Sequence, residues 1–196
     1  MSSTQSLTRD GGGDSTAIGN MIKFAIAEYA ADPERVYVTG GSSGAMMANV
    51  LAATYPDLIK AVSAYSGVAA GCFRGAGVAQ WNNTCSGGQS VATAEAWGAV
   101  ARGMYPDYAA DAPRPKMQIW HGGVDSTIAP QNYQEEIKQW TNVFGVAEEP
   151  TGETQNFPQA GYVMSDYGEN VQGIFAQSVG HSVPSNLTAS ELWFGL

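Results

Sequence analysis

Apolar and polar positions change period several times along the chain, and the first regular stretch has the helical period. Its apolar residues recur three or four positions apart: Ile18, Met21, Ile22, Ala25, Ile26 and Tyr29. A single apolar stripe of this kind predicts an amphipathic helix that packs on a sheet. Asp14 or Ser15 is expected to cap its start, and Asp32–Pro33 to end it.

Short β-rich runs alternate with helical stretches through the rest of the chain. We expect strands at 35–39, 60–65 and 116–120, a strand pair (or a turn into a last strand) at 160–168 and 170–179, and helices at 45–54, 91–105, 133–144 and near 190–196. This alternation is the pattern of an α/β protein with a parallel sheet. No repeat or linker divides residues 1–196, so we predict a single domain.

The segment Gly40-Gly41-Ser42-Ser43-Gly44 follows a predicted strand, opens a predicted helix and satisfies the pattern G-x-S-x-G. In a nucleophile elbow a serine occupies a strained turn with the flanking backbone pressed close, so glycine is required two residues to either side. The five-residue pattern also fits a plain turn, but its context favours Ser42 as a nucleophile. The backbone N–H of Ser43 would then point to where an oxyanion develops.

A serine nucleophile needs a base and an orienting acid, and in α/β-hydrolases the acid and then the histidine follow the serine along the chain. Asp125 and His181 each come directly after a predicted strand, at the strand ends where open α/β sheets place their sites. His121 precedes every plausible acid, so we interpret it as a structural histidine that binds loop backbone. Three rival carboxylates lack such a strand-end position: Asp107, Asp111 and Asp166.

Composition narrows the function classes. Nine basic and eighteen acidic residues give a net charge of −9, which argues against nucleic acid or an anionic membrane as partner. No apolar run approaches the ~18 residues of a membrane helix, and the polar N-terminus has no signal-peptide core. The two histidines and two cysteines have no metal-ligand spacing, so we expect neither a metal nor a cofactor.

A Gly/Asn/Ser-rich loop at 67–90 contains Cys72 and Cys85, which are either two free thiols or one disulfide. Asn-x-Thr triplets occur at Asn82 and Asn186, although such triplets often arise by chance. Three aromatic residues could stack on sugar rings, although each is more often plain packing: Trp81, Tyr105 and Tyr108.

Four strings in the sequence are characteristic of a known family: RVYVTGGSSGAMMANVLAATYPDLIKAVSAYSGVAAGCF, WNNTC, RPKMQIWHGGVDSTI and GHSVP. Through them the chain resembles, from about residue 10 to the C-terminus, the secreted acetyl xylan esterases and feruloyl esterases of carbohydrate esterase family 1, close relatives of polyhydroxybutyrate depolymerase-like esterases. This resemblance implies an α/β-hydrolase fold, a mostly parallel sheet with helices on both faces. By resemblance Ser42 is the nucleophile, Asp125 the acid and His181 the base. It also implies a Cys72–Cys85 disulfide, a secreted protein and glycosylation at Asn82.

The resemblance implies a serine esterase that removes acetyl groups from xylan without a cofactor, with plant cell-wall polysaccharide as its partner. A feruloyl or short-chain polyester hydrolase is the alternative, and a catalytically inactive remnant that binds polysaccharide is the alternative of another class. Family members carry several strands before the helix that starts here near Asp14, and a loop there supplies a second oxyanion N–H. We therefore expect a fold that lacks its N-terminal strands and keeps about four strands.

Overall fold

The computed structural model describes residues 4–75 and 80–196. In this part of the chain one six-stranded sheet has the order β1-β2-β3-β6-β5-β4. The strands are β1 (Tyr37–Gly41), β2 (Ala61–Tyr65), β3 (Lys116–Gly122), β4 (Gly152–Gln155), β5 (Tyr162–Asp166) and β6 (Val171–Ala176). Strands β1, β2, β3 and β6 are parallel, whereas β5 and β4 extend the sheet in antiparallel fashion. The predicted α/β class with a mostly parallel sheet is confirmed.

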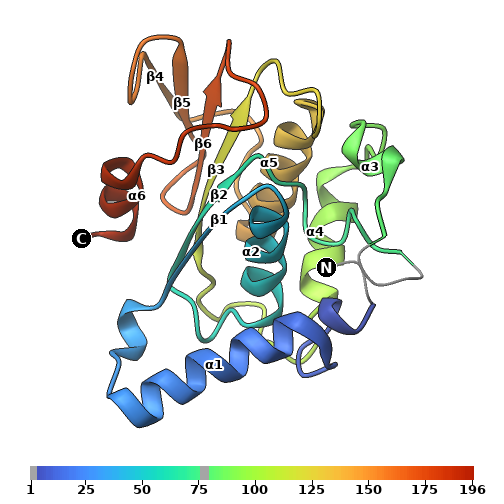
Figure 1. Ribbon diagram of the computed structural model, residues 1–196, viewed down its shortest axis with the longest axis vertical. Coiled ribbons are helices and arrows are strands. Elements are labelled where there is room, and N and C mark those ends of the chain that lie inside the picture. Colours follow the sequence, from blue (N-terminus) through green and yellow to red (C-terminus); the bar gives the residue numbers. More distant parts are fainter. Residues whose placement is uncertain (1–3, 76–79) are drawn as a thin grey trace.

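Helices cover both faces of this sheet (Figure 1). The helices of the described residues are η1 (Thr4–Leu7), α1 (Gly13–Tyr29), η2 (Pro33–Arg35), α2 (Ser43–Thr54), α3 (Asn83–Ser86), α4 (Ala94–Gly103), α5 (Gln131–Phe144) and α6 (Leu187–Phe194). Helices α2 and α5 pack directly on one face, and α4 packs against α5. Helix α6 lies on the opposite face, against β2. None of the helices in the described ranges is long and apolar enough to cross a membrane.

The core lies on both sides of the central strands. Every residue of β2 is buried, and so is every residue of α2 from Ala45 to Thr54. On the α2 side, Met117 and Ile119 of β3 pack into the main apolar cluster. On the α6 side, the Tyr65 and Trp120 rings stack with centroids 5.0 Å apart. The helix predicted at 45–54 is confirmed as α2.

The strand pair expected at 160–168 and 170–179 is confirmed as the antiparallel β5–β6 ladder. The expected number of about four strands is too low, because the sheet has six strands within residues 4–75 and 80–196. The element without a sequence signal is β4, whose residues Gly-Glu-Thr-Gln are all exposed. A strand with no buried face shows no apolar alternation, so periodicity has nothing to detect there.

Helix α1 forms as predicted but is neither capped nor packed as predicted. Its N-cap is Gly12, and the Ser15 hydroxyl, already inside the helix, donates to the Ser6 carbonyl at 2.7 Å. The helix packs mainly against η1 and α2 rather than on the face of the sheet, and its two buried residues are Ser15 and Gly19. Much of the apolar stripe is therefore uncovered: Met21 is 68% and Tyr29 76% exposed.

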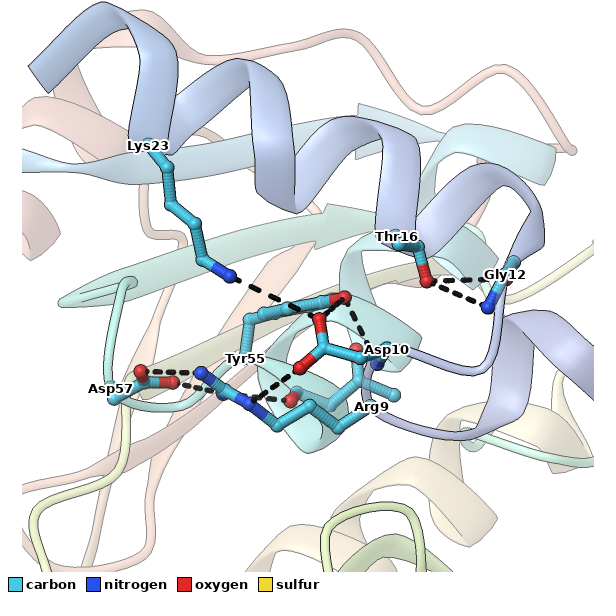
Figure 2. Close-up of polar contacts among 8 residues, drawn as sticks. Arg9, Asp10, Gly12, Thr16, Lys23, Tyr55 and Asp57 are labelled. Carbon is cyan, nitrogen blue, oxygen red and sulfur yellow. Dashed lines mark hydrogen bonds and ion pairs between the residues drawn. The ribbon is translucent and has the colours of Figure 1, made fainter. Parts of the chain in front are cut away.

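Polar contacts tie the segment before α1 to the end of α2 (Figure 2). The Arg9 guanidinium binds both carboxylate oxygens of Asp57 and donates to the Thr54 carbonyl at 3.3 Å. The Tyr55 hydroxyl donates to Asp10 at 3.0 Å, and Lys23 of α1 approaches the same carboxylate within 3.9 Å. This cluster fixes where α1 begins, at the amino end of β2.

Candidate active site

Ser42 lies on the turn between β1 and α2 and has φ 54° and ψ −118°. Its backbone N–H donates to the Tyr65 carbonyl at 2.8 Å, which ties the turn to the end of β2. A Cβ at Gly40 would lie 2.5 Å from the carbonyl carbon of Gly44, so only glycine fits at position 40. A Cβ at Gly44 would meet nothing within 4 Å. The expected need for glycine on both sides is therefore wrong at position 44, whose Cα faces open space.

Ser42, His181 and Asp125 form a continuous hydrogen-bonded relay. His181 Nε2 lies 2.8 Å from Ser42 Oγ, and His181 Nδ1 lies 2.8 Å from Asp125 Oδ2. Because an ionised carboxylate only accepts, Nδ1 carries the proton and Nε2 is free to accept the serine proton. The carboxylate of Asp125 is fully buried, whereas the His181 side chain is 23% exposed. In this geometry the Asp125 carboxylate is shielded from solvent, whereas the His181 imidazole is accessible.

Asp125 is oriented by its own loop. Its Oδ1 accepts backbone N–H groups from Thr127 at 2.8 Å and Ile128 at 2.9 Å. Both bonds leave Oδ2 facing His181. Sequence reasoning placed Asp125 at a strand end but had no signal for these two amide donors.

The loop that carries His181 presses against the end of β3. A Cβ at Gly122 would lie 2.3 Å from the carbonyl oxygens of both Val179 and Gly180. Gly123 is equally close-packed, with 2.5 Å to the Gln177 carbonyl oxygen. The Gly-Gly pair therefore lets two backbones approach, which brings His181 to the ends of β3 and β1.

His121 is fully buried on β3, and its Nε2 lies 3.0 Å from the Ile128 carbonyl oxygen. The same nitrogen is 3.5 Å from Asp125 Oδ2. Burial lowers the pKa of the His121 imidazole, and the Ile128 carbonyl and Asp125 only partly oppose that effect. A neutral histidine bound to loop backbone fits the interpretation drawn from the sequence.

The rival carboxylates lie elsewhere. Asp107 and Asp111 are exposed in the loop before β3. Asp166 belongs to β5 and accepts a hydrogen bond from the Gln172 amide at 2.8 Å.

The chain has a Cys72–Cys85 disulfide, as the resemblance implied. Asn82 lies beside it, where its Oδ1 caps α3 by accepting from the Cys85 N–H at 3.1 Å and its Nδ2 donates to the Cys72 carbonyl at 3.2 Å. The nitrogen to which an N-linked glycan would attach is therefore already hydrogen-bonded.

Ser43 is the first residue of α2, where N–H groups have no acceptor within the helix.

The three aromatic candidates separate into two groups. Trp81 is 53% exposed and makes an edge contact with Phe73. Tyr105 and Tyr108 pack on each other, and the Arg9 guanidinium lies 4.3 Å above the Tyr105 ring. These two tyrosines belong to the cluster around Arg9 and Asp57, at the end of the sheet away from Ser42. Of the three residues, only Trp81 has a largely exposed ring.

Sequence reasoning did not identify Glu136, a fully buried carboxyl on α5. Its Oε2 accepts from the Asn49 amide at 2.7 Å, and Asn49 in turn accepts from Trp140 Nε1 at 2.7 Å. Burial raises the pKa of Glu136 to about 8, and the Asn49 bond only partly offsets it. Glutamate in a helix is usually exposed, so no pattern pointed to this residue.

Within residues 4–75 and 80–196, no three His, Cys, Asp or Glu side chains come together as metal ligands.

A serine on the turn after a parallel strand, followed along the chain by an acid and a histidine at neighbouring strand ends, defines the class of α/β-hydrolases. Residues 5–157 match the family model described as "Esterase PHB depolymerase". The chain belongs to this esterase family.

Curated relatives match the whole chain. It is 52% identical over 198 residues to the probable acetylxylan esterase A of Aspergillus clavatus and 51% identical to the acetylxylan esterase A of Emericella nidulans. Both matches cover 100% of this chain and 64% of the relative. The chain therefore spans somewhat less than two thirds of the length of these relatives.

A solved structure shows the same arrangement of the backbone. The acetyl xylan esterase from Aspergillus awamori superposes with a TM-score of 0.96 at 48% identity. The match covers 99% of this chain and 71% of that one.

Proposed function

We propose that this protein is a serine ester hydrolase in which Ser42 is the nucleophile, His181 the general base and Asp125 the orienting acid. The observation that carries the proposal is the relay with two 2.8 Å links, from Ser42 Oγ to His181 Nε2 and from His181 Nδ1 to Asp125 Oδ2. A lone serine hydroxyl is a weak nucleophile, and a hydrogen-bonded base that is itself oriented by a third group activates it.

The reaction follows from these positions. Ser42 Oγ attacks the ester carbonyl while His181 Nε2 accepts its proton, and the imidazolium is stabilised by Asp125. The tetrahedral oxyanion forms beside the first turn of α2, where the Ser43 N–H can donate to it. His181 then returns the proton to the leaving alcohol, and the acyl group remains on Ser42. Water, deprotonated by His181, releases the acid and regenerates the hydroxyl.

Acetylated xylan is the substrate we propose. The support is the 50% level of identity to proteins named acetylxylan esterase, over the full length of this chain. Feruloyl and short-chain polyester bonds require the same acyl transfer, so the relay alone does not separate them.

The disulfide supports a location in an oxidising compartment, and we propose that the protein is secreted.

Hydrolysis of p-nitrophenyl acetate by the purified 196-residue chain tests the proposed chemistry. Ser42→Ala and Asp125→Asn are each expected to lower kcat by about 10⁴-fold or more. Ser42→Ala removes the nucleophile, and Asp125→Asn removes the carboxylate that orients His181. Ser178→Ala and Asp111→Asn are matched controls at exposed positions outside the relay and should retain wild-type rates. Equal rates for wild type and Ser42→Ala would contradict the proposal and favour a non-catalytic polysaccharide-binding protein.

Acetate release from acetylated xylan, ferulate release from methyl ferulate and cleavage of a 3-hydroxybutyrate trimer separate the three substrate classes. We expect the largest kcat/KM on acetylated xylan. A preference for either of the other two esters would overturn the substrate assignment while leaving the relay intact.

A further inference from the structure

His121 is a second histidine that lies close to Asp125, besides His181. It lies on β3, four residues before Asp125, and is fully buried. Its Nε2 is 3.0 Å from the Ile128 carbonyl oxygen and 3.5 Å from Asp125 Oδ2. It therefore touches both the loop that holds the acid and the acid itself.

The position of the imidazole proton follows from its partners. A carbonyl oxygen only accepts, so the bond to Ile128 requires the proton on Nε2. Nδ1 is buried and has no hydrogen-bond partner among the described residues. Burial also lowers the pKa of this imidazole, so it carries one N–H. That N–H donates to the Ile128 carbonyl, and Asp125 Oδ2 lies 3.5 Å from the same nitrogen.

Ile128 closes a ring with these two side chains. Its N–H donates to Asp125 Oδ1 at 2.9 Å, and its carbonyl accepts from His121. The backbone of Ile128 thus binds Asp125 through its N–H and His121 through its carbonyl. Rotation of the carboxylate away from His181 would break the ring.

We propose that His121 is a positioning residue of the relay: its Nε2–H binds the Ile128 carbonyl, and Ile128 in turn binds Asp125, so that Oδ2 stays aligned with His181. The proposal rests on the proposed function of the relay. It assigns His121 no contact with substrate, and it extends the role of this histidine from loop structure to the orientation of the acid.

Two substitutions separate positioning from simple filling of space. Glutamine can place an N–H donor where His121 Nε2 lies, whereas leucine fills the space without a donor. His121→Leu is expected to lower kcat on p-nitrophenyl acetate by about 10- to 100-fold with KM changed less than about threefold, because a small misalignment of the acid affects the chemical step. His121→Gln should recover kcat to within about threefold of wild type. Equal losses in the two variants, or a leucine variant with wild-type kcat, would overturn the proposal.

A measurement on the wild-type chain keeps the test independent of folding in the variants and of activity. Nitrogen-15 NMR of labelled histidines should show His121 protonated on Nε2 and unprotonated on Nδ1. Protonation on Nδ1 would contradict the proposed donor directly. A wild-type chain without esterase activity would contradict the proposed function. The NMR measurement would still show whether His121 Nε2 carries the proton that the positioning role requires.

Discussion

Ser42 has a backbone conformation, φ 54° and ψ −118°, that a side chain rarely adopts and that costs of order 1–3 kcal/mol. Two backbone hydrogen bonds hold it: Ser42 N–H donates to Tyr65 at 2.8 Å, and its carbonyl accepts from Met46 at 3.0 Å. The strain directs Oγ out of the turn and toward His181. At this scale the two glycines of the elbow are not equivalent, since only Gly40 contacts the facing backbone.

Alanine at each elbow glycine tests this difference. Gly40→Ala would place its Cβ 2.5 Å from the backbone of Gly44, so we expect destabilisation of about 1–3 kcal/mol and at least a 100-fold loss of esterase activity. Gly44→Ala meets no atom within 4 Å in the described part of the chain and should unfold at or above the wild-type temperature. Thermal unfolding of both variants, with kcat/KM of Gly40→Ala, provides the comparison. Equal destabilisation in both variants would contradict the difference in close contacts between Gly40 and Gly44.

Elements meet at this site through their ends rather than their faces. Strand β1 supplies the turn before Ser42, β3 leads into the Asp125 loop, and β6 leads into the loop with His181. The last two are joined by backbone bonds: Gly123 N–H donates to Ala176 at 2.8 Å, and Val124 N–H donates to Val179 at 3.1 Å. The separation of the Asp125 and His181 side chains is therefore set by two strand ends that lie against each other.

Gly122→Ala should force these strand ends apart. Its Cβ would lie 2.3 Å from two backbone carbonyl oxygens in the segment before His181, and backbone cannot move aside as a flexible side chain can. We expect kcat to fall by about 100-fold from displacement of the base. Gly103→Ala, at the last residue of α4 with no atom within 4 Å, is the matched control and should keep wild-type activity. An active Gly122→Ala variant would show that the His181 loop is not fixed by this contact.

At the scale of the whole molecule, one buried acid couples folding to pH. Glu136 joins α5 to α2 through Asn49, and burial raises the pKa of Glu136 to about 8 in the folded protein. The unfolded chain releases this proton near pH 4.5. Between these two values the folded state binds more protons, so the stability contributed at this position falls as pH rises, by about 1.4 kcal/mol per pH unit.

Glu136→Gln keeps the shape and the acceptor for Asn49 but cannot ionise. Its free energy of unfolding, relative to wild type, should rise steadily from pH 5 to pH 8 and level off above pH 8. Urea unfolding across this range measures the difference. Glu148→Gln, at an exposed position, controls for the loss of one negative charge. A difference between Glu136→Gln and wild type that does not change with pH would contradict a protonated Glu136.

The sequence by itself determined most of the elements and most of the candidate site. The helix predicted at 45–54, the parallel strands and the strand-end positions of Asp125 and His181 follow from patterns that depend on neighbours in the chain. The G-x-S-x-G spacing likewise pointed to Ser42, because the steric demand of the turn is local. The resemblance supplied the Cys72–Cys85 pairing.

Only the tertiary structure decided how distant segments meet. It showed that α1 leaves much of its apolar stripe uncovered, that the polar β4 extends the sheet, and that the ring of Asp125, Ile128 and His121 closes behind the relay. It also placed Glu136 against Asn49, 87 residues away in the chain. Periodicity records which side of an element is apolar, whereas contacts between side chains far apart in sequence depend on packing that no single segment contains.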